Sequence, residues 1–367
     1  MKTEVWASLA GALIVAGSSA ARDLVVSPGG LSPQAALEKI RAAKARGDKS
    51  AWTVRVKGGL YTLAEPLVLT PSDSGTSAAP VRWVGERGRS VFAGGSAIGG
   101  WRNDGDGVWS APLPTGPDGK PAFFEQLWVN GRRATLAKSP NERYHYIRQT
   151  IPGIGKRGMY VHKEDLAPLA KLSKEKLGRV IFRIWWSWER ESNRIARMDA
   201  DKGTVELEKD FLYDIFRWRS QGKETRYTLE NYREALDAPG EFFIEKGELL
   251  YIPREGETLE TVRAVAPKAN GLLVFRGDPA KGEIVRDVTV RRVGFEHSAF
   301  TPVLGDVVPH QSGINMGIAA IQADGAENLR FEWEKGQVTF IIQDLDGYDP
   351  EDMISTISFK VCVTRNM

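Results

Sequence analysis

The spacing of apolar residues changes along the chain and divides it into segments. Between Gln34 and Ala45 apolar residues recur at helical spacing, and Ser32-Pro33 supplies an N-cap followed by proline at the first helical position. From Trp52 to Gly100 they form short alternating runs separated by glycine-rich turns. Short strands with frequent turns are typical of stacked coils rather than of a sandwich. The sequence therefore predicts a solenoid of strands whose first coil is covered by an amphipathic helix.

A second kind of pattern occupies residues 101–267. Its alternating runs are longer, and Asn130-Gly131 is a strong hairpin signal. These features predict an inserted antiparallel β-rich domain. Short runs then return, and the segments around Val288 and Leu329 share a weak repeat of apolar and charged positions. The expected organisation is a cap with the first coils at 22–100, the insertion at 101–267, resumed coils at 268–332 and a divergent tail at 333–367.

The first 21 residues have the features of a secretory signal peptide. Lys2 forms a short basic region, Val5 to Gly17 is apolar, and Ser18-Ser19-Ala20 is a small-residue cleavage site. The apolar run is shorter than the roughly 20 residues that cross a bilayer, and a buried N-terminal helix is the alternative. We expect a secreted or periplasmic protein with no membrane span.

Charge and cysteine content narrow the class of protein further. The formal net charge is +3, and basic clusters such as Arg132-Arg133 are interleaved with acidic or apolar residues. A nucleic-acid partner is therefore not expected, because such proteins concentrate basic charge on one surface. The single cysteine, Cys362, excludes an intrachain disulfide framework.

Several segments resemble secreted carbohydrate-active enzymes with a right-handed parallel β-helix, in particular the glycoside hydrolases that include α-L-fucosidases and xylanases. The matching segments are 58–63, 67–76, 94–101, 127–133, 230–242, 249–253 and 291–297. The resemblance implies an all-β, pectin-lyase-like fold, namely the N-terminal part of a helix-capped right-handed parallel β-helix with an inserted β-rich domain. It also implies a polysaccharide or oligosaccharide partner. The catalytic acids of this family lie on later coils, whereas the coil pattern here stops near Glu332, so an incomplete and inactive enzyme is expected.

Glycoside hydrolysis uses two carboxylic acids, one as acid and the other as base or nucleophile. Within the resumed coils the catalytic candidates are Glu296, His297 and Asp324. Glu296 and His297 directly follow a predicted strand, where a pair of side chains facing a groove is expected. The alternative is that Glu296 points outward and His297 is a hydrogen-bonded turn residue.

The candidates for substrate binding are Trp186, Trp188, His310 and Gln311. The two tryptophans belong to an aromatic run that suits stacking on sugar rings, although tryptophans alternating in a strand more often fill a core. His310 and Gln311 lie in the loop between the two copies of the repeat. Loops that project from a solenoid often carry its function, and an ordinary loop is the alternative.

The tail resembles part of the calcium-dependent phospholipid-binding domain found in synaptotagmin and protein kinase C. Asp344, Asp346 and Asp352 have the spacing of the carboxylates in one calcium loop of that domain. Calcium requires several converging oxygen ligands, and the other calcium loops are absent from the sequence. A solvated acidic turn is the alternative, and a foreign or mis-joined C-terminus is the preferred account of the tail. Calcium is the one cofactor that the sequence suggests.

Three functions follow from these patterns. The first is a secreted glycoside hydrolase that lacks its later catalytic coils. The second is a non-catalytic protein that binds carbohydrate or lies at the cell surface. The third is a polysaccharide lyase, which would need a basic side chain near a calcium ion or another neutralising group.

Overall fold

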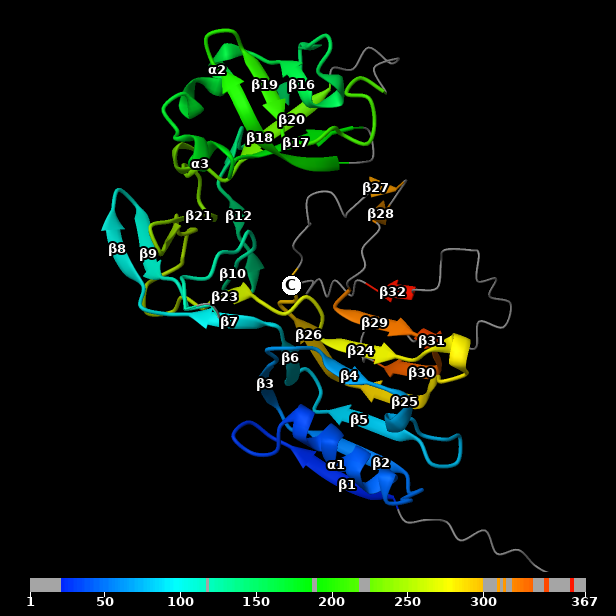
Figure 1. The fold of residues 1–367 in the computed structure, drawn as a ribbon. Helices are drawn as coiled ribbons and strands as arrows, with labels where there is room; N and C mark the ends of the chain where they lie inside the picture. The colour runs from blue at the N-terminus through cyan, green and yellow to red at the C-terminus, as the bar shows by residue number, and fades with distance from the viewer. Residues whose placement is uncertain are drawn as a thin grey trace, which may run out of the picture.

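The computed structural model describes residues 21–116, 119–186, 190–217, 225–299, 309–310, 313–314, 319–332, 340–342 and 357–359. Most of the regular structure is strand, so the predicted all-β class is confirmed (Figure 1). The α-helices are α1 (Pro33–Ala45), α2 (Lys163–Leu166) and α3 (Lys174–Leu177), and short 3-10 turns lie at Pro71–Asp73, Gly155–Arg157, Ala167–Leu169, Arg233–Ala235 and Pro279–Lys281. Within these residues no helix has the length and apolar character needed to cross a bilayer.

Three sheets of parallel strands form the lower half of the molecule in Figure 1. Sheet A consists of β1 (Arg22–Val26), β2 (Trp52–Val56), β5 (Val81–Gly85), β25 (Val285–Arg291) and β30 (Ala326–Glu332), in that order. Sheet B consists of β3 (Gly59–Thr62), β6 (Ser90–Ala93) and β26 (Val293–Glu296). Sheet C consists of β4 (Leu67–Leu69), β24 (Leu273–Arg276) and β29 (Ile321–Asp324). All neighbouring pairs among these strands are parallel.

The chain passes through sheets A, B and C in turn, and we call one such passage a rung. The rungs are β2–β3–β4, β5–β6–β24 and β25–β26–β29. Their registers place buried residues directly above one another, as in the row Val54, Trp83 and Val290 of sheet A. In sheet B the ring of Phe92 contacts Tyr61 and Phe295 edge to face, each at a centroid distance of 5.8 Å. One core therefore runs through all the rungs.

Helix α1 lies against the first rung, as the sequence predicts. The Ser32 hydroxyl accepts a hydrogen bond from the Ala35 amide at 3.1 Å, and Pro33 occupies the first turn. Leu37 and Ile40 are fully buried in the same core as the rungs. The helix thus covers apolar surface that the first rung would otherwise expose.

A large insertion leaves the rungs after β6 and returns at β24. Its linking sheet consists of β7 (Gly95–Ile98), β23 (Ala264–Pro267), β10 (Trp128–Val129) and β11 (Arg132–Arg133). A second sheet consists of β8 (Arg102–Gly105), β9 (Val108–Pro112), β22 (Glu248–Tyr251), β21 (Glu241–Glu245) and β12 (Thr135–Leu136). The third consists of β13 (Lys138–Ser139), β14 (His145–Tyr146), β15 (Gln149–Thr150), β16 (Gly158–Tyr160), β17 (Ile181–Trp185), β18 (Arg190–Asp199), β19 (Thr204–Leu207) and β20 (Arg226–Glu230). Two further cores belong to this insertion.

The hairpin signal in the insertion lies where the sequence predicts it. Asn130 and Gly131 have φ angles of 51° and 75° and join β10 to β11 as an antiparallel pair. Two consecutive residues with positive φ are what a tight hairpin turn requires. Most pairs in the insertion are antiparallel, whereas β12 and β21 run parallel.

Strands from the tail pair with the last described rung. β31 (Phe340–Ile342) runs antiparallel to β30, and β32 (Ile357–Phe359) runs antiparallel to β29. The main-chain groups of β30 and β29 at the edges of sheets A and C therefore pair with strands of the tail. This pairing shows how the tail contacts the rungs.

One buried ion pair joins the helical cap to the rungs. The fully buried carboxylate of Asp73 accepts hydrogen bonds from Nε and Nη2 of Arg41, both at 2.7 Å. The same carboxylate accepts a hydrogen bond from the Thr70 amide at 2.7 Å. A buried ion that loses its partner is strongly destabilising, because its desolvation is no longer compensated.

We expect Asp73→Ala to lower the free energy of unfolding by about 3 kcal/mol, as measured by urea denaturation. The exposed pair of Arg55 and Asp23 is a matched control, since its side chains are 58% and 48% exposed. Asp23→Ala should change the free energy of unfolding by about 1 kcal/mol or less. Equal effects of the two substitutions would contradict this role of Asp73.

Candidate functional site

Glu296 and His297 lie at the end of β26, where sheet B leads toward sheet C. Glu296 is exposed, and its carbonyl oxygen accepts a hydrogen bond from the Gly94 amide at 3.1 Å. His297 has a φ angle of 57° and is half-buried. Its ring meets the indole of Trp128 edge to face, at a centroid distance of 5.4 Å. Trp128 belongs to the linking sheet, so this contact joins the insertion to the rungs.

The imidazole of His297 has an unusual environment. Its Nδ1 atom is buried and has no hydrogen-bond partner among the described residues. Burial lowers the pKa of His297 below its ordinary value, and the negative charge of Glu296 opposes this effect in part. The ring is therefore neutral at pH 7 and is able to accept a proton or a hydrogen bond.

Asp324, the third catalytic candidate, is placed elsewhere. It ends β29 of sheet C, and its Oδ2 accepts a hydrogen bond from Nε2 of Gln322 at 3.0 Å. Each rung passes from sheet A to sheet B and then to sheet C. Glu296 therefore lies where the chain turns from sheet B to sheet C, and Asp324 lies where it turns from sheet C back to sheet A. A strand of sheet C separates the two turns, so the structure does not bring the two candidates together.

Two neighbouring tryptophans of the insertion, Trp185 and Trp186, differ in their burial. Trp186 is 5% exposed, packs edge to face on Phe211, and donates its indole N–H to the carbonyl oxygen of Ile215 at 3.2 Å. It therefore fills the core of the insertion and does not face a ligand. Trp185 precedes it on the opposite face of β17 and is only half-buried, as strand alternation requires.

Aromatic rings and guanidinium groups gather around Trp185. The guanidinium carbon of Arg190 lies 5.5 Å from the centroid of the Trp185 ring, and the Tyr144 ring lies 5.7 Å from it. The guanidinium of Arg226 lies 4.8 Å from the Tyr144 ring. Cations held over aromatic faces at these distances are attracted by the ring quadrupole.

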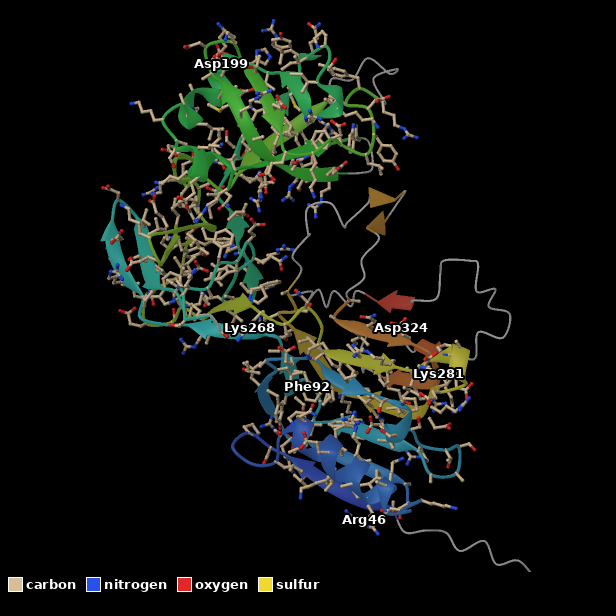
Figure 2. The ribbon with its side chains drawn as sticks, viewed as in Figure 1. Arg46, Phe92, Asp199, Lys268, Lys281 and Asp324 are labelled. Atoms are coloured by element: carbon tan, nitrogen blue, oxygen red, sulfur yellow. The ribbon has the colours of Figure 1, made fainter. Side chains whose placement is uncertain are left out.

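A second group of rings and cations lies on the linking sheet. The guanidinium of Arg133 lies 5.5 Å from the Trp128 ring. Desolvation lowers the pKa of Arg190, as do the positive charges of Arg183 and Arg133, whereas the negative charge of Glu230 raises it. We call the two groups together the aromatic strip, which consists of His297, Trp128, Arg133, Arg190, Trp185, Tyr144 and Arg226. Figure 1 shows β7, β10 and β23 between the parallel sheets and the third sheet of the insertion, and Figure 2, in the same view, labels Phe92 in the parallel part and Asp199 in that third sheet.

The aromatic strip carries more positive than negative charge. Beside it, the buried carboxylate of Glu230 contacts Arg183 at 2.9 Å and accepts a hydrogen bond from Thr228 at 3.0 Å. Flat apolar rings suit the faces of sugars, and guanidinium groups donate to hydroxyl or carboxylate oxygens. The arrangement therefore has the chemistry of a saccharide-binding surface with affinity for negative charge.

Sequence reasoning missed most of the aromatic strip. It selected Trp186, which the structure buries, and not the neighbouring Trp185 at the end of β17, because the run of apolar residues at 181–186 does not show which side faces the core. No sequence signal relates Trp128 to His297, because these residues are far apart in the chain. Their contact depends on the path of the insertion.

Five other predicted site residues lie outside the described residues, namely Trp188, Gln311, Asp344, Asp346 and Asp352. Of His310 only the backbone is described. It belongs to β27 (Pro309–His310), which pairs with β28 (Gly313–Ile314). Within the described part of the chain, no group of three or more His, Cys, Asp or Glu side chains is placed to hold a metal ion. Calcium binding by the tail stays a prediction.

Comparison with known proteins supports the fold. A solved structure of a glycoside hydrolase matches with a TM-score of 0.71 and 21% identity, over 84% of this chain and 61% of that chain. A structure of XylC in complex with xylose matches with a TM-score of 0.31 and 13% identity, over 80% of this chain and 37% of that chain, which is too distant to carry an argument. No protein-family model and no curated protein matches the sequence. The first likeness shows a shared fold, and a fold alone does not transfer an activity.

The environment of His297 gives a prediction for pH dependence. We expect its ring protons to titrate in NMR spectra with a midpoint below about 6.5, assigned by their loss in His297→Gln. Because the folded state binds this proton less readily than the unfolded state, the free energy of unfolding should fall as the pH drops below that value. The His297→Gln variant should lack this contribution. A midpoint at or above the ordinary value would contradict the burial of the ring.

Proposed function

We propose that this chain forms the front part of a right-handed parallel β-helix and binds a polysaccharide or oligosaccharide along the aromatic strip. The strip carries the proposal, because it combines half-buried aromatic rings with arginines that lie over or beside them. The stack of three parallel sheets and the structural likeness to a glycoside hydrolase support it. The N-terminal segment supports export to the periplasm or the medium.

The proposed reaction class is glycoside hydrolysis, with fucosides or xylan as the first substrates to test. Glu296 is the carboxylic acid next to the strip, since it precedes His297 at the end of β26. A second carboxylate is needed at about 5 to 10 Å from the first. Asp324 lies at another corner of the rung, and Glu230 is bound to Arg183. Binding by the strip is therefore better supported than hydrolysis by the described residues.

A polysaccharide lyase is the second candidate, and the His297 environment favours it. A lyase removes a proton next to a uronate carboxylate, which requires a base and a positive group that neutralises the carboxylate. His297 would supply the base, because burial lowers its pKa and keeps the imidazole neutral. The positive group would be the guanidinium of Arg133, which lies over the ring of Trp128 next to His297. Lyase action leaves an unsaturated sugar that absorbs ultraviolet light, whereas hydrolysis leaves a reducing end without this absorbance.

Binding by the aromatic strip is tested with neutral xylohexaose in isothermal titration calorimetry. We expect Trp185→Ala to weaken binding of xylohexaose about tenfold, which equals about 1.4 kcal/mol. The exposed ring of Phe123 lies under the guanidinium of Arg179 at 5.8 Å, which makes Phe123→Ala a matched control outside the strip. Unchanged binding in Trp185→Ala, or equal losses in both variants, would contradict the proposal.

Catalysis is tested separately from binding. Release of reducing ends from xylan, cleavage of an aryl α-L-fucoside and the ultraviolet absorbance of a treated uronate polymer distinguish the reaction classes. If Glu296 is a catalytic acid, Glu296→Gln should reduce the rate of hydrolysis at least about a hundredfold while binding remains within twofold. Turnover that is unaffected by this substitution would exclude that role for Glu296.

A further inference from the structure

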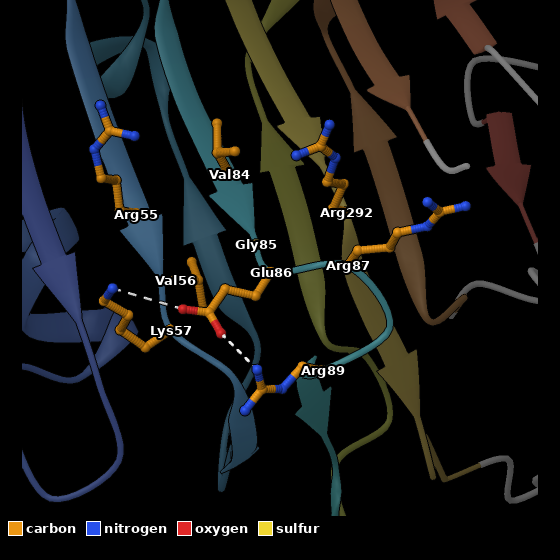
Figure 3. A pocket seen from close by; sticks show the side chains of 9 residues that line it. All are labelled: Arg55, Val56, Lys57, Val84, Gly85, Glu86, Arg87, Arg89 and Arg292. Atoms are coloured by element: carbon orange, nitrogen blue, oxygen red, sulfur yellow. Dashed lines mark ion pairs between the residues drawn. The ribbon is translucent and has the colours of Figure 1, made fainter.

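A basic hollow lies at the opposite end of sheet B from the aromatic strip. It has a volume of about 510 Å³ and lies where β2 and β5 end and the chain turns from sheet A to sheet B (Figure 3). Its charged lining residues are Arg55, Lys57, Glu86, Arg87, Arg89 and Arg292. The volume is within the range of about 300 to 1,000 Å³ that is typical of ligand sites. We call this site the A–B corner.

Positive charge dominates the A–B corner. Lys57 and Arg89 share the carboxylate of Glu86, at 3.6 and 3.7 Å, and Figure 3 shows Glu86 between them. Arg55 pairs with Asp23 at 2.9 Å, outside the hollow. These side chains are largely exposed, and exposed ion pairs contribute little free energy. A bound anion would therefore lose little free energy by displacing Glu86 from Lys57 and Arg89.

Two arginines at the ends of sheet A strands lie on one line along the axis on which the rungs stack. Arg55 on β2 is in register with Val84 on β5, and Val84 is in register with Arg291 on β25, just before Arg292. Neighbouring parallel strands are about 4.8 Å apart. Arg55 and Arg291 are therefore two strand spacings apart, about 9.6 Å, with the apolar side chain of Val84 between them.

This arrangement suits a linear polymer whose negative charges are widely spaced. Nucleic acid has a higher charge density, with one phosphate per about 3.4 Å of each strand of a duplex. An acidic polysaccharide has one carboxylate or sulfate per sugar or per few sugars, and sugar length is comparable with the strand spacing. We propose that the A–B corner binds the carboxylate or sulfate groups of an acidic polysaccharide. It is a site separate from the strip, because the two lie at opposite ends of the strands of sheet B.

The test uses the full chain and three probes in isothermal titration calorimetry at low and high salt. The probes are hexagalacturonate, a sulfated carrageenan hexamer and neutral xylohexaose. We expect an acidic probe to bind, with an affinity that falls as salt rises. The probe that binds more tightly identifies carboxylate or sulfate as the preferred group. Absence of binding by both acidic probes at low salt would overturn the proposal.

Two variants with opposite expected effects locate the binding. The double variant Lys57→Gln with Arg89→Gln should weaken binding of the acidic probe about tenfold. The variant Glu86→Gln should tighten it several-fold, because it removes the internal competitor for Lys57 and Arg89. Since a merely structural role predicts no tightening, Glu86→Gln also keeps the proposal falsifiable if the double variant unfolds.

Matched controls separate local from general charge effects. Lys39→Gln with Arg46→Gln changes the net charge equally on the exposed face of α1 and should leave binding unchanged. Arg190→Gln with Trp185→Ala alters the aromatic strip and should preserve salt-dependent binding at the A–B corner. An equal loss in the α1 variant would overturn the proposal. Tighter binding of a single-stranded DNA oligonucleotide than of either acidic saccharide would overturn the choice of ligand.

Discussion

The parallel register between successive rungs is the constraint on which the other features of this protein depend. Trp83 is paired with Val54 on one side and Val290 on the other, and Phe92 contacts Tyr61 and Phe295 in the same way. A shift of one residue in any strand would turn its buried row outward. The same register therefore fixes the position of every outward residue and every turn.

This constraint explains how a long insertion is accommodated between two strands of one rung. The chain leaves after β6 and returns at β24, where Leu273 pairs with Leu67 of the preceding rung. The parallel pairing between rungs is thus the same as it would be if a short loop joined β6 to β24. The linking sheet then places Trp128 against His297, and Trp185 lies in the larger sheet of the same insertion. The proposed saccharide-binding surface begins where the two parts meet.

The two proposed sites differ in how the rungs create them. At the A–B corner, cationic side chains gather where the strands of sheet A end, so consecutive turns of the rungs contribute to one basic hollow. At the aromatic strip, residues from different elements meet through non-repeating contacts. Substitutions at the A–B corner should change how ligand affinity depends on ionic strength, whereas substitutions at the aromatic strip should change the stacking of sugar rings on aromatic side chains. A polymer with both sugar faces and negative charges would engage the two sites by different interactions.

The sequence by itself determined the local features of this protein. The cap of Ser32 and Pro33 on α1, the hairpin at Asn130-Gly131 and the short alternating strands depend on residues close in the chain, so spacing alone predicts them. Only the tertiary structure decided the site. Trp186 is buried and Trp185 faces the surface because of the side on which the insertion packs its core, and Glu296 and Asp324 are separated because the rung turns between them. Contacts such as that between Trp128 and His297 leave no local pattern, since the path of the intervening chain creates them.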